Sequence, residues 1–101
     1  MLNVGLANFT QEVIKAEGPV LVDFYSVTCG PCRMLKPVLA QVAEQGVKVV
    51  GVDIDDEPEL TQHFGIQGVP TVIAFANGKA GQRVVGVKPA QDLLALASSA
   101  A

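Results

Sequence analysis

The 101-residue sequence contains no tryptophan, one histidine and only two cysteines. It also lacks a basic tract, because its seven lysines and arginines are scattered and its formal net charge is −3. Nucleic-acid binding is therefore not expected, since attraction to phosphates supplies most of its affinity. No apolar run reaches the roughly 18 residues that span a bilayer, so we expect no membrane association.

The N-terminal stretch MLNVGLANFTQ has neither a basic region nor a long apolar segment. A signal peptide is therefore not expected, and we expect a cytoplasmic protein. Two cysteines are too few for a disulfide-stapled scaffold. Half of the residues are hydrophobic and 17% are charged, which favours a packed core. The length predicts a single domain over residues 1–101, and we expect a monomer.

Hydrophobic periodicity predicts the element order α-β-α-β-α-β-β-α. The first helix is expected at residues 8–18, with Asn8 as its N-cap and Gly18 after its end. The other elements are helices at 32–45, 57–65 and 88–99, strands at 19–26 and 47–54, and a hairpin within 71–87 that turns at Asn77-Gly78. This pattern predicts an α/β fold, a mixed sheet with a parallel portion, an antiparallel C-terminal hairpin and helices on both faces.

Both cysteines lie in the segment SVTCGPCRMLKP, where Gly30 and Pro31 separate Cys29 from Cys32. Residues three apart on a helix are neighbours, so the two sulfurs can form a disulfide with little backbone movement. Gly30 and Pro31 suit a first helical turn. The partial positive charge of a helix N-terminus stabilises a thiolate. We therefore assign Cys29 as the attacking thiolate and Cys32 as the resolving thiol.

Three other interpretations of the cysteine pair remain open at this point. The pair could be a structural staple, although a core this apolar hardly needs one. It could be half of a zinc site, but His63 is the only histidine and a second copy of the chain would have to supply ligands. It could also be two small core residues. We predict no metal site and expect His63 to face solvent without a function.

Asp23 stands out because it interrupts the apolar strand PVLVDFYS. A buried carboxyl without a partner has a raised pKa and can exchange protons near neutral pH. The alternative is a carboxylate at a sheet edge that points to water. Pro70, preceded by Val69, is ambiguous on its own, since only about 5–6% of such bonds are cis in folded proteins. We interpret Pro37 as a simple helix kink.

From about Phe9 to Leu96 the chain resembles the thioredoxin family. The resemblance rests on VDF before the cysteines, CGPC itself, Pro37, the segment GIQGVPT, and the later NGK and VVGV. It implies the thioredoxin fold and reduction of protein disulfides by dithiol–disulfide exchange. It also implies that the only cofactor is the redox-active Cys29–Cys32 disulfide. The implied partners are disulfide-bearing client proteins and a thioredoxin reductase, usually an NADPH-dependent flavoprotein.

The resemblance also implies roles for individual residues. It implies that the Val69–Pro70 bond is cis, which would place the Val69 backbone beside the sulfurs, where a substrate segment could pair with it. It implies that Asp23 moves a proton to and from Cys32. The expected substrate-binding residues are Thr28, Gly30, Pro31, Gly68, Val69, Pro70 and Gly86.

The chain departs from the family pattern at three positions. Thr28 stands where the family usually has tryptophan, and Tyr25 occupies a second tryptophan position. Gly51 stands where the family tends to have a lysine near the buried aspartate, so we expect the pKa of Asp23 to lie higher still. These changes predict a reductase with altered substrate preference or potential. The CGPC filling and the absence of an export signal argue against an oxidant or isomerase.

A function of another class also remains open. The chain could be a thioredoxin-fold interaction module that binds a partner and depends little on its thiols. Replacing both cysteines by serine separates these functions, because a redox carrier loses its activity and an interaction module keeps its role.

Overall fold

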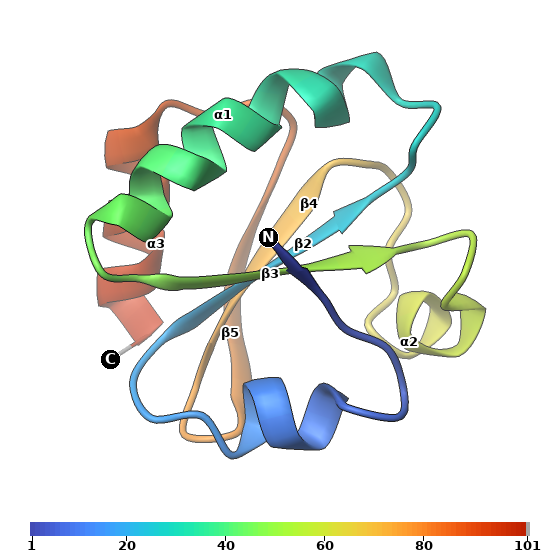
Figure 1. The fold of residues 1–101 in the computed structure, drawn as a ribbon, viewed down its shortest axis with the longest axis horizontal. Helices are drawn as coiled ribbons and strands as arrows, with labels where there is room; N and C mark the ends of the chain where they lie inside the picture. Colours follow the sequence, from blue (N-terminus) through green and yellow to red (C-terminus); the bar gives the residue numbers. More distant parts are fainter. Residues whose placement is uncertain (101) are drawn as a thin grey trace.

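A computed structural model describes residues 1–100. A five-stranded mixed sheet forms its centre, with the strand order β1-β3-β2-β4-β5 (Figure 1). The strands are β1 (Leu2–Asn3), β2 (Val20–Tyr25), β3 (Lys48–Asp53), β4 (Thr71–Ala76) and β5 (Lys79–Val85). Strands β1, β3 and β2 run parallel, whereas β4 is antiparallel to both β2 and β5. The predicted fold class is confirmed.

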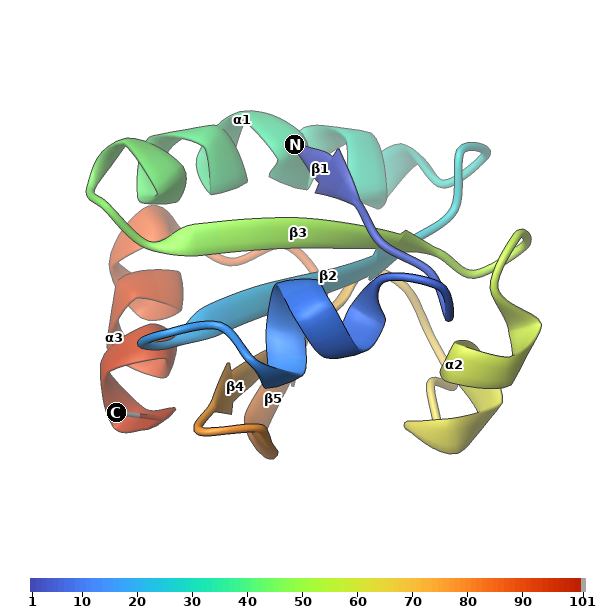
Figure 2. The same ribbon diagram turned by 60° about the horizontal axis from the view of Figure 1, so that its bottom comes forward.

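Helices cover both faces of this sheet (Figure 2). They are η1 (Thr10–Ile14), α1 (Gly30–Glu44), α2 (Pro58–His63) and α3 (Ala90–Ala100). Buried side chains of α1 and α3 form one core cluster with one face of the strands, and η1 and α2 contribute to a second cluster on the opposite face. Side chains of β2 alternate between these clusters, as the pleat requires. Leu21 lies in the cluster with α1 and α3, whereas Val22 and Phe24 lie in the other.

The N-terminal region differs from the expectation for residues 8–18. The helix is shorter, covering Thr10–Ile14, and has π-helical winding, in which the Lys15 N–H donates to the Thr10 carbonyl at 2.8 Å. The predicted Asn8 cap is wrong, because the Asn8 Oδ1 instead accepts a hydrogen bond from the Gly5 N–H at 2.8 Å. Strand β1 lies outside the predicted elements, since two residues carry no readable periodicity.

The C-terminal hairpin follows the prediction closely. Strands β4 and β5 are joined by Asn77 and Gly78, which both have positive φ, at 54° and 78°. This conformation suits the twist of a two-residue hairpin, and Asn-Gly is the sequence that adopts it most readily. Strand β5 forms the exposed edge of the sheet, and α3 then packs against β4, β5 and α1.

Candidate active site

The two cysteines lie at the N-terminus of α1 and form a disulfide. Cys29 is the N-cap residue with extended backbone, and Pro31 occupies the first turn, where it needs no N–H partner. The Cα atoms are 5.2 Å apart, within the range that a disulfide accepts. The helix begins at Gly30 rather than at Cys32, because the Gly-Pro pair itself forms the first turn.

The two sulfurs differ in their surroundings. Cys29 is half-buried, and its Sγ accepts a hydrogen bond from the Cys32 N–H at 3.1 Å. Cys32 lies in the first turn of α1 and is buried, with 1% exposure. An N–H at a helix start favours a negative charge on the atom that it contacts. Cys29 is therefore the sulfur that is accessible to solvent and that also accepts an N–H from the start of the helix.

A loop that precedes β4 borders the disulfide at the same end of the sheet. The Val69 carbonyl oxygen lies 3.8 Å from the Cys29 Sγ. The Val69–Pro70 peptide bond is cis, as the resemblance implied. The Thr71 Oγ1 donates to the Gly68 carbonyl at 2.6 Å, and the Gly86 N–H donates to the Pro70 carbonyl at 2.9 Å. These contacts bring Gly68, Val69, Pro70 and Gly86 to the same end of the molecule as the cysteines.

A polar network supports the segment before Cys29. The Ser26 hydroxyl lies 3.1 Å from the Thr28 Oγ1 and donates to the Asp55 Oδ2 at 3.0 Å. The Ser26 carbonyl accepts from the Cys29 N–H at 3.2 Å. Sequence reasoning missed Ser26 and Asp55, which are 29 residues apart and meet only in the folded chain. Thr28 itself is exposed.

Asp23 lies inside the protein on the face of the sheet that α1 covers. Its side chain is fully buried, and neither carboxyl oxygen has a hydrogen-bond partner among the described residues. Burial raises the pKa of Asp23 to about 7, while the positive charge of Lys36 acts in the opposite direction. The alternative of an edge carboxylate in water is therefore wrong, and the predicted rise in pKa is confirmed.

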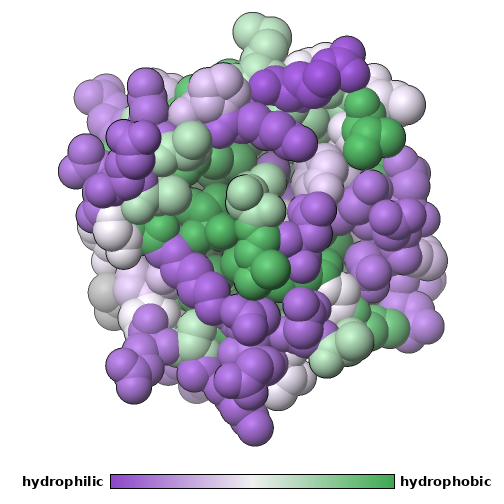
Figure 3. All heavy atoms as spheres, in the orientation of Figure 1, coloured by the Kyte–Doolittle hydropathy of each residue, from purple (hydrophilic) through white to green (hydrophobic). Residues whose placement is uncertain are grey.

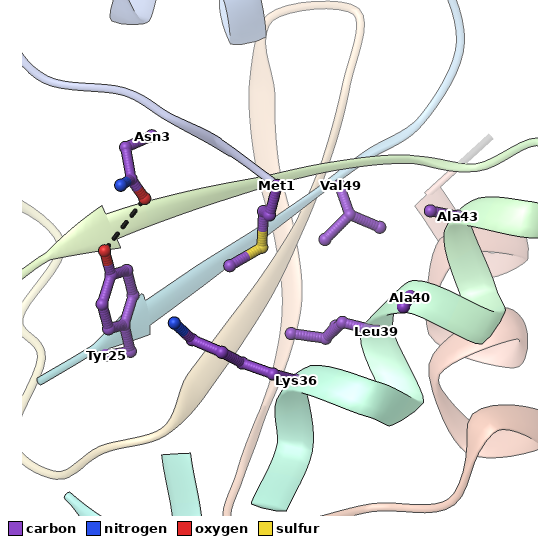
Figure 4. A pocket seen from close by; sticks show the side chains of 8 residues that line it. All are labelled: Met1, Asn3, Tyr25, Lys36, Leu39, Ala40, Ala43 and Val49. Carbon is purple, nitrogen blue, oxygen red and sulfur yellow. Dashed lines mark hydrogen bonds between the residues drawn. The ribbon is translucent and has the colours of Figure 1, made fainter. Parts of the chain in front are cut away.

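Next to Asp23, a cavity of about 370 Å³ lies between α1, β1 and β3. Figure 3 shows apolar side chains gathered in the middle of this face, bordered by hydrophilic ones. Residues from β1, β2, α1 and β3 line the cavity, and the polar ones among them are Asn3, Tyr25 and Lys36 (Figure 4).

The chain matches the family model described as "Thioredoxin" over residues 1–99. The chain belongs to the thioredoxin family. It is 44% identical over 90 residues to a thioredoxin of Alicyclobacillus acidocaldarius. The aligned residues cover 86% of this chain and 85% of that protein. It is 41% identical over 98 residues to a thioredoxin of Pseudomonas aeruginosa, with 94% and 91% covered.

Solved structures agree with this assignment. A mutant thioredoxin from Halobacterium salinarum superposes with a TM-score of 0.89 at 37% identity, covering 98% of this chain and 88% of that one. Membership of the thioredoxin family, together with the Cys29–Cys32 pair, makes the chain a thiol–disulfide oxidoreductase. Thioredoxins work through a redox-active disulfide.

Two further observations concern the described residues only. Within residues 1–100, no three acidic, histidine or cysteine side chains gather in a way that could hold a metal ion. In the same range, no helix has the length and apolar character needed to cross a membrane.

His63 is exposed, with its ring edge-on to Phe64 at 4.8 Å between centroids.

Proposed function

We propose that this thioredoxin reduces disulfides in client proteins, with Cys29 as the attacking thiolate, Cys32 as the resolving thiol and Asp23 as the proton acceptor. The observation that carries the proposal is the contrast between the two sulfurs. Cys29 is half-buried and accepts the Cys32 N–H, whereas Cys32 is buried at 1% exposure. A protein disulfide can reach only the first of them.

The reaction then follows in two exchanges. In the reduced protein, the Cys29 thiolate attacks one client sulfur, a mixed disulfide forms, and the second client sulfur leaves and takes a proton. The Cys32 thiol next gives its proton to the Asp23 carboxylate and attacks the Cys29 sulfur. The mixed disulfide breaks, the departing client sulfur takes up a proton so that the client leaves with two thiols, and the Cys29–Cys32 disulfide forms. A thioredoxin reductase returns two electrons to that disulfide.

The residues around Cys29 form the proposed client-binding surface. Thr28, Gly30 and Pro31 border the sulfur along the chain, and Gly68, Val69, Pro70 and Gly86 come from the facing loop and the end of β5. Val27, Met34 and Val85 add exposed apolar side chains, at 60%, 67% and 57% exposure. An extended client segment that pairs with the Val69 backbone would place its disulfide next to Cys29.

Single serine variants test the assigned roles. With insulin as the client, Cys32→Ser is expected to accumulate a mixed disulfide through Cys29, because the second exchange is blocked. Cys29→Ser is expected to form no such adduct, and both variants should lose turnover by at least roughly 100-fold, since each removes one of the two required sulfurs. Mass spectrometry under non-reducing conditions identifies the adduct.

An adduct through Cys32 in the Cys29→Ser variant, formed as fast as the expected one, would reverse the assignment. The double serine variant provides a separate check on the reductase function. Full cellular function of that variant would show that partner binding, rather than thiol exchange, is the role of the chain.

A further inference from the structure

The buried carboxyl of Asp23 has few charged neighbours. Its partner on β3 is Gly51, which has no side chain, and its partner on β4 is the apolar Val72. Leu21 and Tyr25 are its neighbours along the same face of β2. The β-strands that flank Asp23 therefore place no cation beside it.

The remaining elements that pack on this face are β1, α1 and α3. Strand β1 follows Met1, which carries the α-amino group and lines the cavity. Helix α3 contributes apolar side chains, and its Asp92 is exposed to water. Helix α1 contributes the two sulfurs at its start and Lys36 one turn later. Among these groups, the charge that acts appreciably on Asp23 is that of Lys36.

Lys36 is held in a defined direction. Its side chain lies along the cavity, with the Nζ 5.0 Å from the centre of the Tyr25 ring (Figure 4). An ammonium group is attracted to the face of an aromatic ring at this distance. The Tyr25 hydroxyl donates to the Asn3 Oδ1 at 2.9 Å, which fixes the ring between β1 and α1. The ammonium group therefore points along the cavity toward the sheet, although Lys36 remains exposed to water.

Strand β3 leaves little space for a side chain at Gly51, the position opposite Asp23. A Cβ atom on Gly51 would lie 2.9 Å from the Asn3 Oδ1, 2.9 Å from the Met1 Cε and 3.0 Å from the Tyr25 Cε1. A side chain at Gly51 would have to push aside the ends of the Asn3 and Met1 side chains or the Tyr25 ring that holds Lys36. The side chains that pack over Gly51 therefore include the Tyr25 ring that holds the Lys36 cation on α1.

We propose that Lys36, held against the Tyr25 ring on the face of the sheet that also carries Asp23, is a positioning residue that favours the ionised form of Asp23 in this chain. It acts through charge and touches neither sulfur nor client. The contribution of Lys36 to turnover rests on the proposed function, in which Asp23 accepts the Cys32 proton. The effect of Lys36 on the ionisation of Asp23 does not depend on that function, so the two effects can be tested separately.

The direct test is a titration of the Asp23 carboxyl carbon by NMR in the oxidised protein at low salt, where no thiol titrates. Lys36→Met is expected to raise the Asp23 midpoint by about half a pH unit, because an opposite charge favours the ionised form and an exposed lysine is partly screened. Lys36→Arg keeps the charge and should keep the wild-type midpoint. Lys79→Met makes the same change in net charge on an exposed residue beside the distant hairpin turn.

The inference is overturned if Lys36→Met leaves the midpoint unchanged, or if Lys79→Met shifts it equally. A second measurement addresses the role in turnover, using the pH profile of insulin reduction. Lys36→Met should move that profile by the same half unit, and in an Asp23→Asn background it should move it no further. If the NMR midpoint shifts and the profile does not, Lys36 still controls Asp23, and the proposed role of Asp23 as proton acceptor is wrong.

Discussion

The two faces of the central sheet are built differently. On the face covered by η1 and α2, four aromatic rings pack on one another, with Phe64 within 5.3–5.9 Å of the centroids of Phe9, Phe24 and Phe75. The buried members of this cluster are all apolar. On the face covered by α1 and α3, the apolar cluster is aliphatic and lies beside a buried carboxyl, a disulfide and a cavity.

Strand β2 belongs to both faces, and it shows what separates them. Its alternate residues Val22 and Phe24 enter the aromatic cluster, whereas Asp23 between them enters the other face without a hydrogen-bond partner among the described residues. A buried ionised carboxyl is unfavourable, and dense apolar packing is favourable. The comparison indicates that both faces bury apolar clusters, and that the face with α1 and α3 also holds the groups that exchange electrons and protons.

The largest expected effect comes from breaking the aromatic face. Phe75 is 1% exposed and contacts both Phe9 and Phe64. Phe75→Ala should lower the free energy of unfolding by about 3–5 kcal/mol, from lost burial and the cavity that remains. Urea denaturation measures this, and Phe75→Leu provides a milder variant if the alanine variant does not fold. The NMR midpoint of Asp23 in Phe75→Leu should match that of the wild type, and a shift of a full pH unit would show that the faces are not independent.

On the other face, Asp23→Asn should stabilise the protein in a pH-dependent way. Because the pKa of Asp23 is about 7 in the folded state and 3.8 is its ordinary value, the folded state binds the proton more tightly. Wild-type stability therefore falls as pH rises from about 4 to about 7, by up to about 4 kcal/mol. The asparagine variant lacks this loss, so its advantage over the wild type should grow across that window.

Urea denaturation of both proteins at about pH 4 and about pH 8, on either side of that window, measures the difference. Asp92→Asn, which removes an exposed carboxylate from α3, is the matched control and should show no such growth. An equal gain at both pH values would mean that the pKa of Asp23 is the same in the folded and unfolded states, so that its burial does not raise its pKa.

Much of this contrast could be predicted from the sequence. A continuous apolar run with one carboxylate indicates a strand covered on both sides, so burial and the rise in the pKa of Asp23 follow from local pattern and general physics. The disulfide at a helix start follows from Cys-Gly-Pro-Cys in the same way. These features depend on neighbours in the chain, which can be read directly along the sequence.

The features that could not be predicted depend on contacts between distant segments. Strand β1 is too short to have a pattern, and its packing over Gly51 is a tertiary fact. From the sequence, Lys36 is only one of the scattered cations, and Gly51 leaves Asp23 without a compensating charge. One signal is present, because Lys36 follows Cys32 by four residues and so lies on the same side of α1.

The smallest expected effect concerns the segment between β2 and α1, which leads from the sheet to the disulfide. Ser26→Ala removes the hydroxyl that bridges Thr28 and Asp55, leaving the exposed Asp55 to water. We expect a loss of about 1–2 kcal/mol in the free energy of unfolding, the size of one or two lost hydrogen bonds. Faster hydrogen exchange at the Thr28 amide should accompany it, because that N–H bonds to the lost hydroxyl, and a smaller increase is expected at the Cys29 amide, which bonds to the Ser26 carbonyl in the same turn. The control Ser99→Ala, which removes a hydroxyl bonded to the Leu96 carbonyl on α3, should change neither amide. Unchanged exchange in Ser26→Ala would mean that the backbone of this segment is held by β2 and α1 alone, so that the polar bridge contributes nothing to the position of Cys29.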